Sequence, residues 1–165
     1  MRIVAGEFKG RTLHGPEGKA TRPTSDKVRE ALFSILGDVT GLRALDLFAG
    51  TGAVGIEAVS RGAESAVLVE RDRRMIAVIE QNLSVTSGLE DDRITVLRSN
   101  ALRFVGDYAD APFDLVFLDP PYADAPAIAP KLSELLPRVL APGATVVTES
   151  DRRAPLVLDE NAFPL

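Results

Sequence analysis

The chain has 165 residues, of which 45% are hydrophobic, and its 19 Lys and Arg against 24 Asp and Glu give a formal net charge of −5. This length suits a single soluble domain with a buried core. The lack of cysteine excludes disulfides, thiolate metal sites and cysteine nucleophiles, and a single histidine, His14, leaves a multi-histidine metal centre without ligands, so no metal is expected.

The charge is unevenly distributed along the chain. Residues 1–43 carry eight basic and five acidic side chains, whereas residues 44–165 carry 11 basic and 19 acidic ones. A basic segment on an acidic body predicts a phosphate grip near the N-terminus, with a solvated charged face as the alternative. The candidate RNA contacts are Arg2, Lys9, Arg11, Lys19 and Arg22.

The chain contains no apolar run near the ~20 residues that a membrane span needs. Its first ten residues lack the apolar centre of a signal peptide. A cytoplasmic protein without a membrane partner is therefore expected.

The first 40 residues predict a small hairpin followed by one helix. Residues 2–13 hold two short apolar runs around a Gly-containing turn, which predicts the hairpin. Thr24 or Ser25 can cap a helix that Gly37 ends. Apolar residues recur within it at helical spacing, at Val28, Leu32, Ile35 and Leu36.

From residue 43 onward, short apolar runs alternate with longer amphipathic ones. The runs at 44–48, 65–70, 94–98, 113–118 and 143–149 are predicted strands. Predicted helices follow the first four, and the last of them, over 128–140, should end or kink at Pro137. Nearly continuous apolar strands between helices predict a doubly wound α/β fold, with a parallel sheet covered on both faces. The final residues begin like another strand and then stop.

A glycine-rich turn after the first of these strands predicts a nucleotide site. Gly50, Gly52 and Gly55 form G-x-G-x-x-G between a strand and a helix, which lets the backbone approach a ligand. Glu70 ends the next strand, 18 positions after Gly52, where a carboxylate can accept two ribose hydroxyls. Both features suit either a nicotinamide dinucleotide or S-adenosylmethionine (SAM).

Asp46 favours SAM over the dinucleotide. It lies inside the first predicted strand, where burying a carboxylate is costly unless it has a partner. The ammonium of a methionine tail is such a partner, whereas a pyrophosphate would be repelled. The alternative is that Asp46 only braces the glycine turn by accepting backbone amides.

A second motif ends the fourth predicted strand, at Asp119-Pro120-Pro121-Tyr122. Ligands of open α/β sheets bind at the carboxyl ends of the strands, so this motif should lie beside the glycine turn. The prolines remove two amide donors and leave carbonyl acceptors, while Tyr122 offers a flat face. The motif suits a planar ring with an exocyclic amine; a rigid turn with Tyr122 as ordinary packing is the alternative.

Four segments together resemble the RsmD family of class I SAM-dependent methyltransferases, which methylate the exocyclic N2 of a guanine in 16S rRNA. They are RIVAGEFKGRTL, TRPTSDKVREALFSIL, LDLFAGTGAVGIEAVSRGA and FDLVFLDPPY, and the match runs from Arg2 to about Glu149. The resemblance implies a Rossmann-like fold, SAM as methyl donor, and 16S rRNA or the assembling small subunit as partner. It implies catalytic roles for Asp119, Pro120 and Tyr122 and SAM contacts from Asp46, Phe48, Gly50, Gly52, Glu70, Asn100, Ala101, Thr24 and Arg29.

The sequence departs from the family pattern at two places. Asn100 stands where the family usually has Asp, although its amide oxygen can still pair with the adenine amine. The chain also stops before the C-terminal hairpin of this class, which predicts an open sheet edge.

The expected organisation is an RNA-binding extension over residues 1–40 and a methyltransferase core over residues 41–165, acting as a monomer. Three alternatives stay open: methyl transfer to another planar amine, in DNA adenine or protein glutamine; an NAD-dependent oxidoreductase; and an inactive RNA-binding module.

Overall fold

The computed structural model describes residues 1–16, 24–86, 91–150, 153 and 155–163. Its centre is a five-stranded sheet in the order β3-β2-β1-β4-β5, and every neighbouring pair of strands is parallel. The doubly wound α/β prediction is confirmed. The strands are β1 (Arg43–Asp46), β2 (Ser65–Glu70), β3 (Ile94–Arg98), β4 (Phe113–Leu118) and β5 (Leu140–Thr148).

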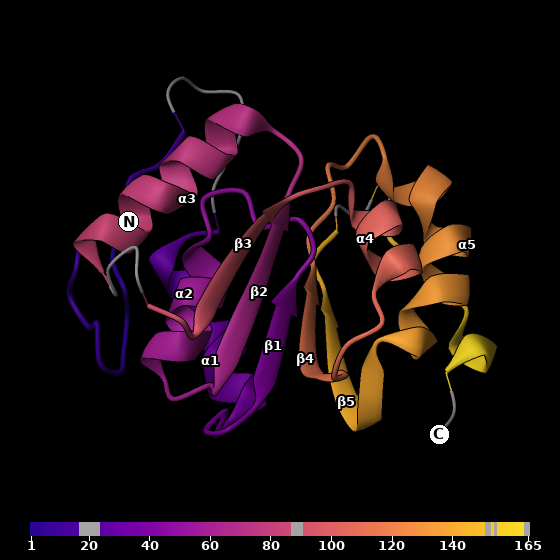
Figure 1. Cartoon of the computed structure of the whole chain (residues 1–165), viewed down its shortest axis with the longest axis horizontal. Coiled ribbons are helices and arrows are strands. Elements are labelled where there is room, and N and C mark those ends of the chain that lie inside the picture. Colours follow the sequence, from indigo (N-terminus) through magenta and orange to yellow (C-terminus); the bar gives the residue numbers. More distant parts are fainter. Residues whose placement is uncertain (17–23, 87–90, 151–152, 154, 164–165) are drawn as a thin grey trace.

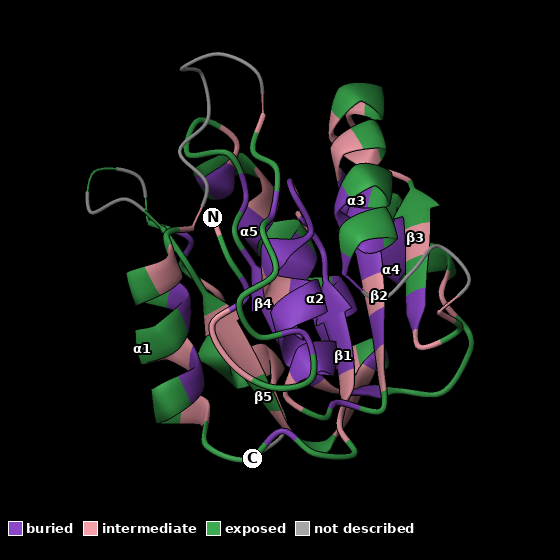
Figure 2. Cartoon of the chain, turned by 90° about the vertical axis from the view of Figure 1, so that its left-hand side faces the viewer, coloured by how far each residue is buried: buried purple, intermediate pink, exposed green. Residues whose placement is uncertain are grey.

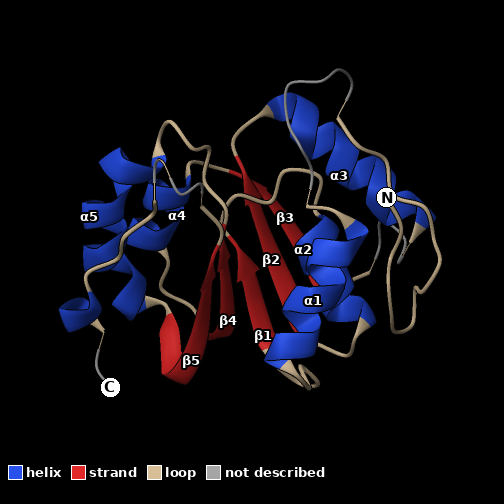
Figure 3. Cartoon of the chain, turned by 180° about the vertical axis from the view of Figure 1, so that it is seen from behind, coloured by secondary structure: helices blue, strands red, loops and turns tan. Residues whose placement is uncertain are grey.

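Helices cover both faces of the sheet (Figures 1 and 3). One face packs against the first three helices and the other against α4 and α5, and each face has its own apolar cluster. The helices are α1 (Asp26–Leu36), α2 (Ala53–Ser60), α3 (Arg73–Val85), α4 (Ala101–Asp107) and α5 (Ala125–Leu135), with short 3-10 turns η1 (Leu136–Arg138) and η2 (Glu160–Ala162).

The central strands β1 and β4 are buried on both sides, and Figure 2 shows the buried residues at the centre of the sheet. Leu45 and Val116, on adjacent central strands, are fully buried in one cluster, and their sequence neighbours Ala44 and Leu115 are buried in the other. A strand that must be apolar on both faces shows no alternation in sequence. This is why the strands are continuous apolar runs.

The strand and helix predictions hold with shifted boundaries. The predicted strands at 65–70, 94–98 and 113–118 match β2, β3 and β4. The first strand ends earlier than predicted, at Asp46, although the Leu47 amide still donates to the carbonyl of Phe117 (3.2 Å). The predicted helix over 128–140 instead spans Ala125–Leu135, and Pro137 lies in the 3-10 turn after it. A proline thus ends the regular helix, as expected.

The predicted N-terminal hairpin is reduced to one antiparallel bridge, between Arg2 and Thr12. Backbone bonds from the Ile3 amide to the Arg11 carbonyl (3.0 Å) and from the Leu13 amide to the Met1 carbonyl (2.8 Å) flank this bridge. The loop between them forms tight turns, in which the Lys9 amide donates to the Gly6 carbonyl (3.2 Å), and it also contacts the end of α2 through the Glu7 amide and the Ser60 carbonyl (2.7 Å).

Helix α1 begins and ends as predicted, and only part of its predicted apolar set faces the core. Ser25, not Thr24, is its N-cap, accepting the Val28 amide, and Gly37 ends it at φ +75°. The buried side chains are Arg29 and Phe33, whereas Val28 and Ile35 are 47% and 84% exposed. Leu32 and Leu36 are partly buried against the core. The apolar spacing therefore identified part of the inner face and missed the share that the buried Arg29 takes.

After β5 the described residues add no further strand, so β4 is the only strand that pairs with β5. The tail instead packs over the α5 side of the sheet. Leu156 is buried in the cluster with α4 and α5, and the Asp159 amide donates to Ser133 Oγ (2.9 Å). No helix of the described chain is long and apolar enough to cross a membrane.

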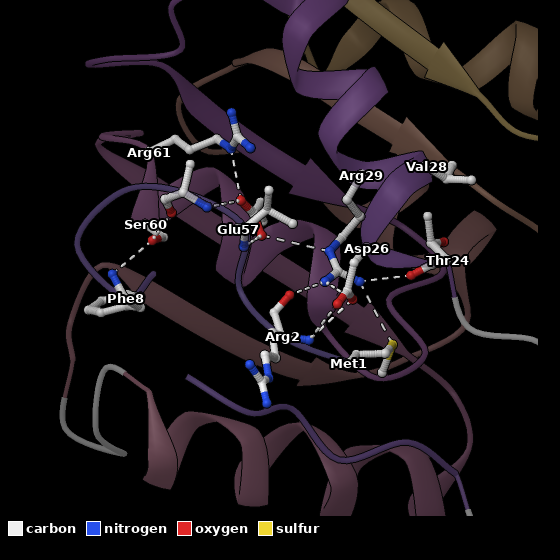
Figure 4. A network of polar contacts seen from close by, with 12 residues as sticks. Met1, Arg2, Phe8, Thr24, Asp26, Val28, Arg29, Glu57, Ser60 and Arg61 are labelled. Atoms are coloured by element: carbon white, nitrogen blue, oxygen red, sulfur yellow. Dashed lines mark hydrogen bonds and ion pairs between the residues drawn. The ribbon is translucent and has the colours of Figure 1, made fainter. Parts of the chain in front are cut away.

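A buried ionic network attaches the N-terminal segment to the core (Figure 4). Glu57 of α2 is fully buried and accepts the backbone amides of Val4 and Ala5 (2.9 and 3.0 Å) and Arg61 Nε (2.8 Å). Arg29 is also fully buried, and its Nε lies 3.7 Å from the Glu57 carboxylate without a hydrogen-bond partner. The carboxylate thus holds a helix and an extended segment together.

The guanidinium of Arg29 completes this network. It donates to the carbonyl of Thr24 (2.7 Å), to the carbonyl of Arg2 and to the carboxylate of Asp26 (2.9 Å). Gly6 lets the segment approach α2 closely, because a Cβ there would lie 1.7 Å from the Ser60 carbonyl oxygen. The first residues of the chain are therefore part of the folded core.

We expect Glu57→Ala to lower the free energy of unfolding by about 3–5 kcal/mol, because it leaves a buried guanidinium and two half-buried amides without their acceptor. Urea unfolding measures the change. Glu64→Ala, which removes an exposed carboxylate, is the matched control and should stay within about 0.5 kcal/mol of the parent. Similar losses in both variants would contradict a structural role for the network.

Candidate functional site

A pocket of about 500 Å³ opens at the carboxyl ends of the strands. The glycine turn after β1 and the motif after β4 both line it, together with the ends of β2 and β5. A volume of this size holds a ligand as large as a nucleoside derivative. The two motifs that the sequence singled out therefore face one cavity.

The glycine turn presents bare backbone to this pocket. Gly50 has φ +53°, and a Cβ there would have only the Phe48 carbonyl oxygen within 4 Å, at 4.0 Å. The position thus combines a left-handed backbone with open space on the side where a side chain would project. Gly52 (φ +76°) does not line the pocket; it is the N-cap of α2 and packs against Ile79 and Leu68.

Glu70, at the end of β2, holds the turn in place. Its carboxylate accepts the amide of Gly50 (2.9 Å) through one oxygen and the amide of Asp72 (2.8 Å) through the other. Each carboxylate oxygen has a second lone pair, so the group can also accept ligand hydroxyls. Glu70 therefore combines a bracing role with a place in the pocket wall.

Asp46 lines the floor of the pocket and is 4% exposed. Backbone amides of Phe48 and Gly55 donate to it, so the bracing role considered from sequence is present. Burial, with the charges of Asp119 and Glu70, raises the pKa of Asp46 to about 7. A buried carboxylate with other carboxylates beside it favours a cation in the space between them.

The motif after β4 forms a corner at the pocket mouth. Pro120 is buried, and Tyr122 is 51% exposed. The Pro121 carbonyl accepts the amides of Asp124 and Ala125, which start α5, whereas within the described residues no donor contacts the Pro120 carbonyl. Burial and the charge of Glu149 raise the pKa of Asp119 to about 7. The corner thus offers a carboxylate, a carbonyl and an aromatic ring.

The other predicted cofactor contacts divide between the pocket and the network behind it. Asn100 and Ala101 line the pocket, and Asn100 also caps α4 by accepting the Arg103 amide (3.2 Å). Thr24 lines it too. Arg29 does not line the pocket, since its guanidinium is in the buried network and reaches the pocket only through the Thr24 carbonyl.

The predicted RNA contacts are spread over the N-terminal segment. Arg2, Lys9 and Arg11 are exposed, whereas Lys19 and Arg22 lie outside the described residues. The loop that carries Lys9 packs against Ser60. Helix α2 begins at the glycine turn beside the pocket and ends at Ser60, so this loop lies at the opposite end of the sheet. None of these three basic residues lines the pocket.

Sequence reasoning missed four charged residues of the pocket wall, which are Arg71, Asp72, Asp124 and Glu149. Arg71 follows β2 and pairs with Asp124 (3.0 Å), and Glu149 follows β5. Arg71 and Glu149 could have been found from the sequence, because each comes directly after a strand. The carboxyl ends of parallel strands lie at one edge of the sheet, where ligands bind.

The described pocket lining is strongly acidic. Arg71 is its one basic side chain, and its carboxylates are Asp46, Glu70, Asp72, Asp119, Asp124 and Glu149. This charge suits the sulfonium and ammonium of SAM and opposes a pyrophosphate. The Gly50 backbone and the apolar side chains of Phe48, Val69 and Met75 suit its adenosine. The described residues hold no group of three or more His, Cys, Asp or Glu placed to bind a metal.

Comparison with known proteins agrees with this geometry. The family model described as "Conserved hypothetical protein 95" matches residues 1–163. "Ribosomal RNA small subunit methyltransferase D" of Escherichia coli (strain K12) is 42% identical over 123 residues, covering 74% of this chain and 60% of that protein. The Haemophilus influenzae protein of the same name is 33% identical, covering 98% of this chain and 84% of that protein.

A solved structure from Thermus thermophilus, described as a hypothetical protein, has a TM-score of 0.81 and 30% identity. It covers 97% of this chain and 91% of that one. The match confirms that the fold extends over nearly all of the sequence.

We expect Asp46→Asn to stabilise the protein increasingly as the pH rises. The pKa of Asp46 is raised above its unfolded value, so its ionisation costs stability between about pH 4 and pH 7. The amide carries no charge and keeps one oxygen for the backbone amides. Urea unfolding at pH 8 should favour the variant by at least about 2 kcal/mol, with the difference closing near pH 4. A pH-independent difference would contradict the raised pKa.

Proposed function

Because the chain belongs to the family of ribosomal RNA small subunit methyltransferase D, we propose that it transfers a methyl group from SAM to the exocyclic N2 of a guanine in 16S rRNA. The substrate is 16S rRNA, either free or in the assembling small subunit, and the place of action is the cytoplasm. Residues 1–40 serve as the RNA-binding extension and residues 41–165 as the methyltransferase core.

One observation carries this proposal. The glycine turn of β1 and the Asp119–Tyr122 corner of β4 line the same pocket, so a methyl donor on one and a planar amine on the other share one enclosed space. Pre-organised proximity is the main requirement for a displacement at a methyl carbon.

In this function, Asp46 attracts the methionine end of SAM, Glu70 accepts the ribose hydroxyls, and Asn100 and Ala101 border the adenine. The Gly50 backbone and Phe48 complete the cradle. When bound, SAM supplies an electrophilic methyl group on a positively charged sulfur.

Asp119 and the Pro120 carbonyl accept the two hydrogens of the target amine, which directs the nitrogen lone pair away from the ring and toward the pocket interior. Tyr122 is exposed enough to stack on the base, a contact worth about 1–3 kcal/mol. The nitrogen gains a bond and must lose a proton. The carboxylate of Asp119, whose pKa is raised to about 7, is suited to accept it.

The alternatives differ in how well they fit the pocket. A nicotinamide dinucleotide would bring a pyrophosphate into a cavity lined by six carboxylates and one arginine in its described part. Methyl transfer to DNA adenine or protein glutamine uses the same corner and differs only in the bound amine. An inactive RNA-binding module would have no use for the acidic pocket.

Mass spectrometry of rRNA nucleosides tests the proposal. Unmethylated small-subunit rRNA incubated with the protein and SAM should gain N2-methylguanosine. Mapping of the product then identifies the target guanine. Methylation of adenine alone, or of no nucleoside, would overturn the proposed function.

We expect Asp119→Ala to reduce methyl transfer by at least about 1,000-fold. The amine loses a hydrogen-bond acceptor, and the proton that it must release loses the group that accepts it. SAM affinity, measured by calorimetry, should stay within a few fold of the parent, since Asp119 holds the substrate base. Equal losses of SAM binding and of methyl transfer would show that Asp119 serves the cofactor or the fold instead.

Neutralising Arg2, Lys9 and Arg11 together, as Arg2→Gln, Lys9→Gln and Arg11→Gln, should weaken rRNA binding and reduce its salt dependence. Each lost phosphate contact lowers the slope of log affinity against log salt by about 0.7–0.9. Filter binding between about 50 and 200 mM salt measures the slope. An unchanged slope would mean that this segment does not grip the RNA.

A further inference from the structure

The last two strands of the sheet end side by side, and an acidic residue follows each. Leu118 of β4 pairs with Thr148 of β5, so Asp119 and Glu149 occupy the next level of the same register. The Glu149 amide donates to the Leu118 carbonyl (2.9 Å), which extends the ladder to this level. In a parallel pair, residues at one level point to the same side of the sheet.

Both carboxylates also line the same pocket, and Glu149 is exposed at its mouth. The proposed function uses the Asp119 carboxylate but gives Glu149 no role. Glu149 is therefore an acceptor next to the corner that holds the target base, on the side away from the glycine turn, because β5 lies beyond β4 in the sheet order.

The chemistry of guanine calls for such an acceptor. Its Watson–Crick edge carries two adjacent donors, the exocyclic N2 amine and the ring N1–H. Asp119 and the Pro120 carbonyl account for the amine, which leaves N1–H without a partner. Adenine and 2-aminopurine have a lone pair at N1 instead, which a carboxylate repels.

We propose that Glu149 accepts the N1–H of the target guanine and so selects guanine among bases with an exocyclic amine. This inference rests on the proposed function, since it concerns the base held by the same corner. Glu149 is the specificity residue of the pocket, and Asp119 remains the residue that handles the reacting nitrogen.

The electrostatics of the pocket support this arrangement. Glu149 is close enough to Asp119 for its charge to raise the pKa of Asp119. The charged groups that face Asp119 are Glu149 from the end of β5 and Asp46 from β1. Two neighbouring carboxylates repel one another until a ligand supplies donors to both, and guanine supplies them from adjacent atoms.

The test compares Glu149→Gln with the parent on an RNA hairpin that carries the mapped target position. The hairpin is made with guanine, with 2-aminopurine, which keeps the N2 amine but has no N1–H, or with 6-thioguanine, which keeps both and changes only the atom at position 6. Glu134→Gln is the matched control, because Glu134 is an exposed carboxylate of α5 that pairs with Lys131 away from the pocket.

We expect Glu149→Gln to lower kcat/KM on the guanine and 6-thioguanine hairpins by about 10- to 100-fold, the value of a hydrogen bond to a charged acceptor. On 2-aminopurine the variant should lose little or gain, because its amide can donate to N1. The preference for guanine over 2-aminopurine should therefore fall by at least about tenfold. Hairpin affinity without SAM should show the same change in preference, and Glu134→Gln should match the parent.

A second readout tests whether the charge of Glu149 acts on Asp119, as their proximity requires. Asp119 must be ionised to accept the amine hydrogens, so the parent's activity should rise as the pH passes about 7. Removing the Glu149 charge lowers the pKa of Asp119, and the acidic limb of the pH profile should move to lower pH in Glu149→Gln.

The outcomes distinguish this inference from the proposed function. If the parent methylates no guanine, the proposed function fails and the inference with it. If the parent methylates guanine but Glu149→Gln keeps the parent's preference over 2-aminopurine, only the inference fails. Equal losses on all three hairpins would also overturn it, because they would assign Glu149 a role that does not depend on N1.

Discussion

Parallel strands end at one edge, and in this protein a carboxylate lies at, or directly after, the end of every strand except β3. Asp46, Glu70, Asp119 and Glu149 come from four different strands, yet all face one pocket. Keeping negative charges this close together is unfavourable unless amides or a cation compensate for them. The backbone amides of the glycine turn provide part of this compensation, which leaves the pocket suited to a positively charged ligand.

The N-terminal segment depends on a second buried charge. Glu57 accepts two backbone amides and pairs with two arginines. One of these arginines, Arg29, also donates to the carbonyl of Thr24 at the pocket wall. The same network thus fixes the exposed residue Arg2 and one side of the cavity. The basic N-terminal segment and the acidic pocket are therefore connected through a network of buried acidic and basic side chains.

Much of this could be predicted from the sequence because its signals are local. Continuous apolar runs located three strands at the residue ranges observed, and the glycine spacing and the Asp-Pro-Pro-Tyr motif located two sides of the pocket. Arg29 could not be placed, because its partners include Glu57, 28 positions after it, and Arg2, 27 positions before it. No periodicity shows that a charge will be buried. Glu149 looked like the last residue of a strand; only the register with β4 places it beside Asp119.

The two raised pKa values, both about 7, tie ligand entry to proton exchange. At neutral pH a fraction of the Asp46 and Asp119 carboxyls still carries a proton, and a cation entering the pocket favours the ionised form and drives that proton into the solvent. The heat of binding will consequently include the heat of protonating the buffer. Titrations in phosphate and in Tris will give different apparent enthalpies for one and the same complex, and the difference between them counts the protons released.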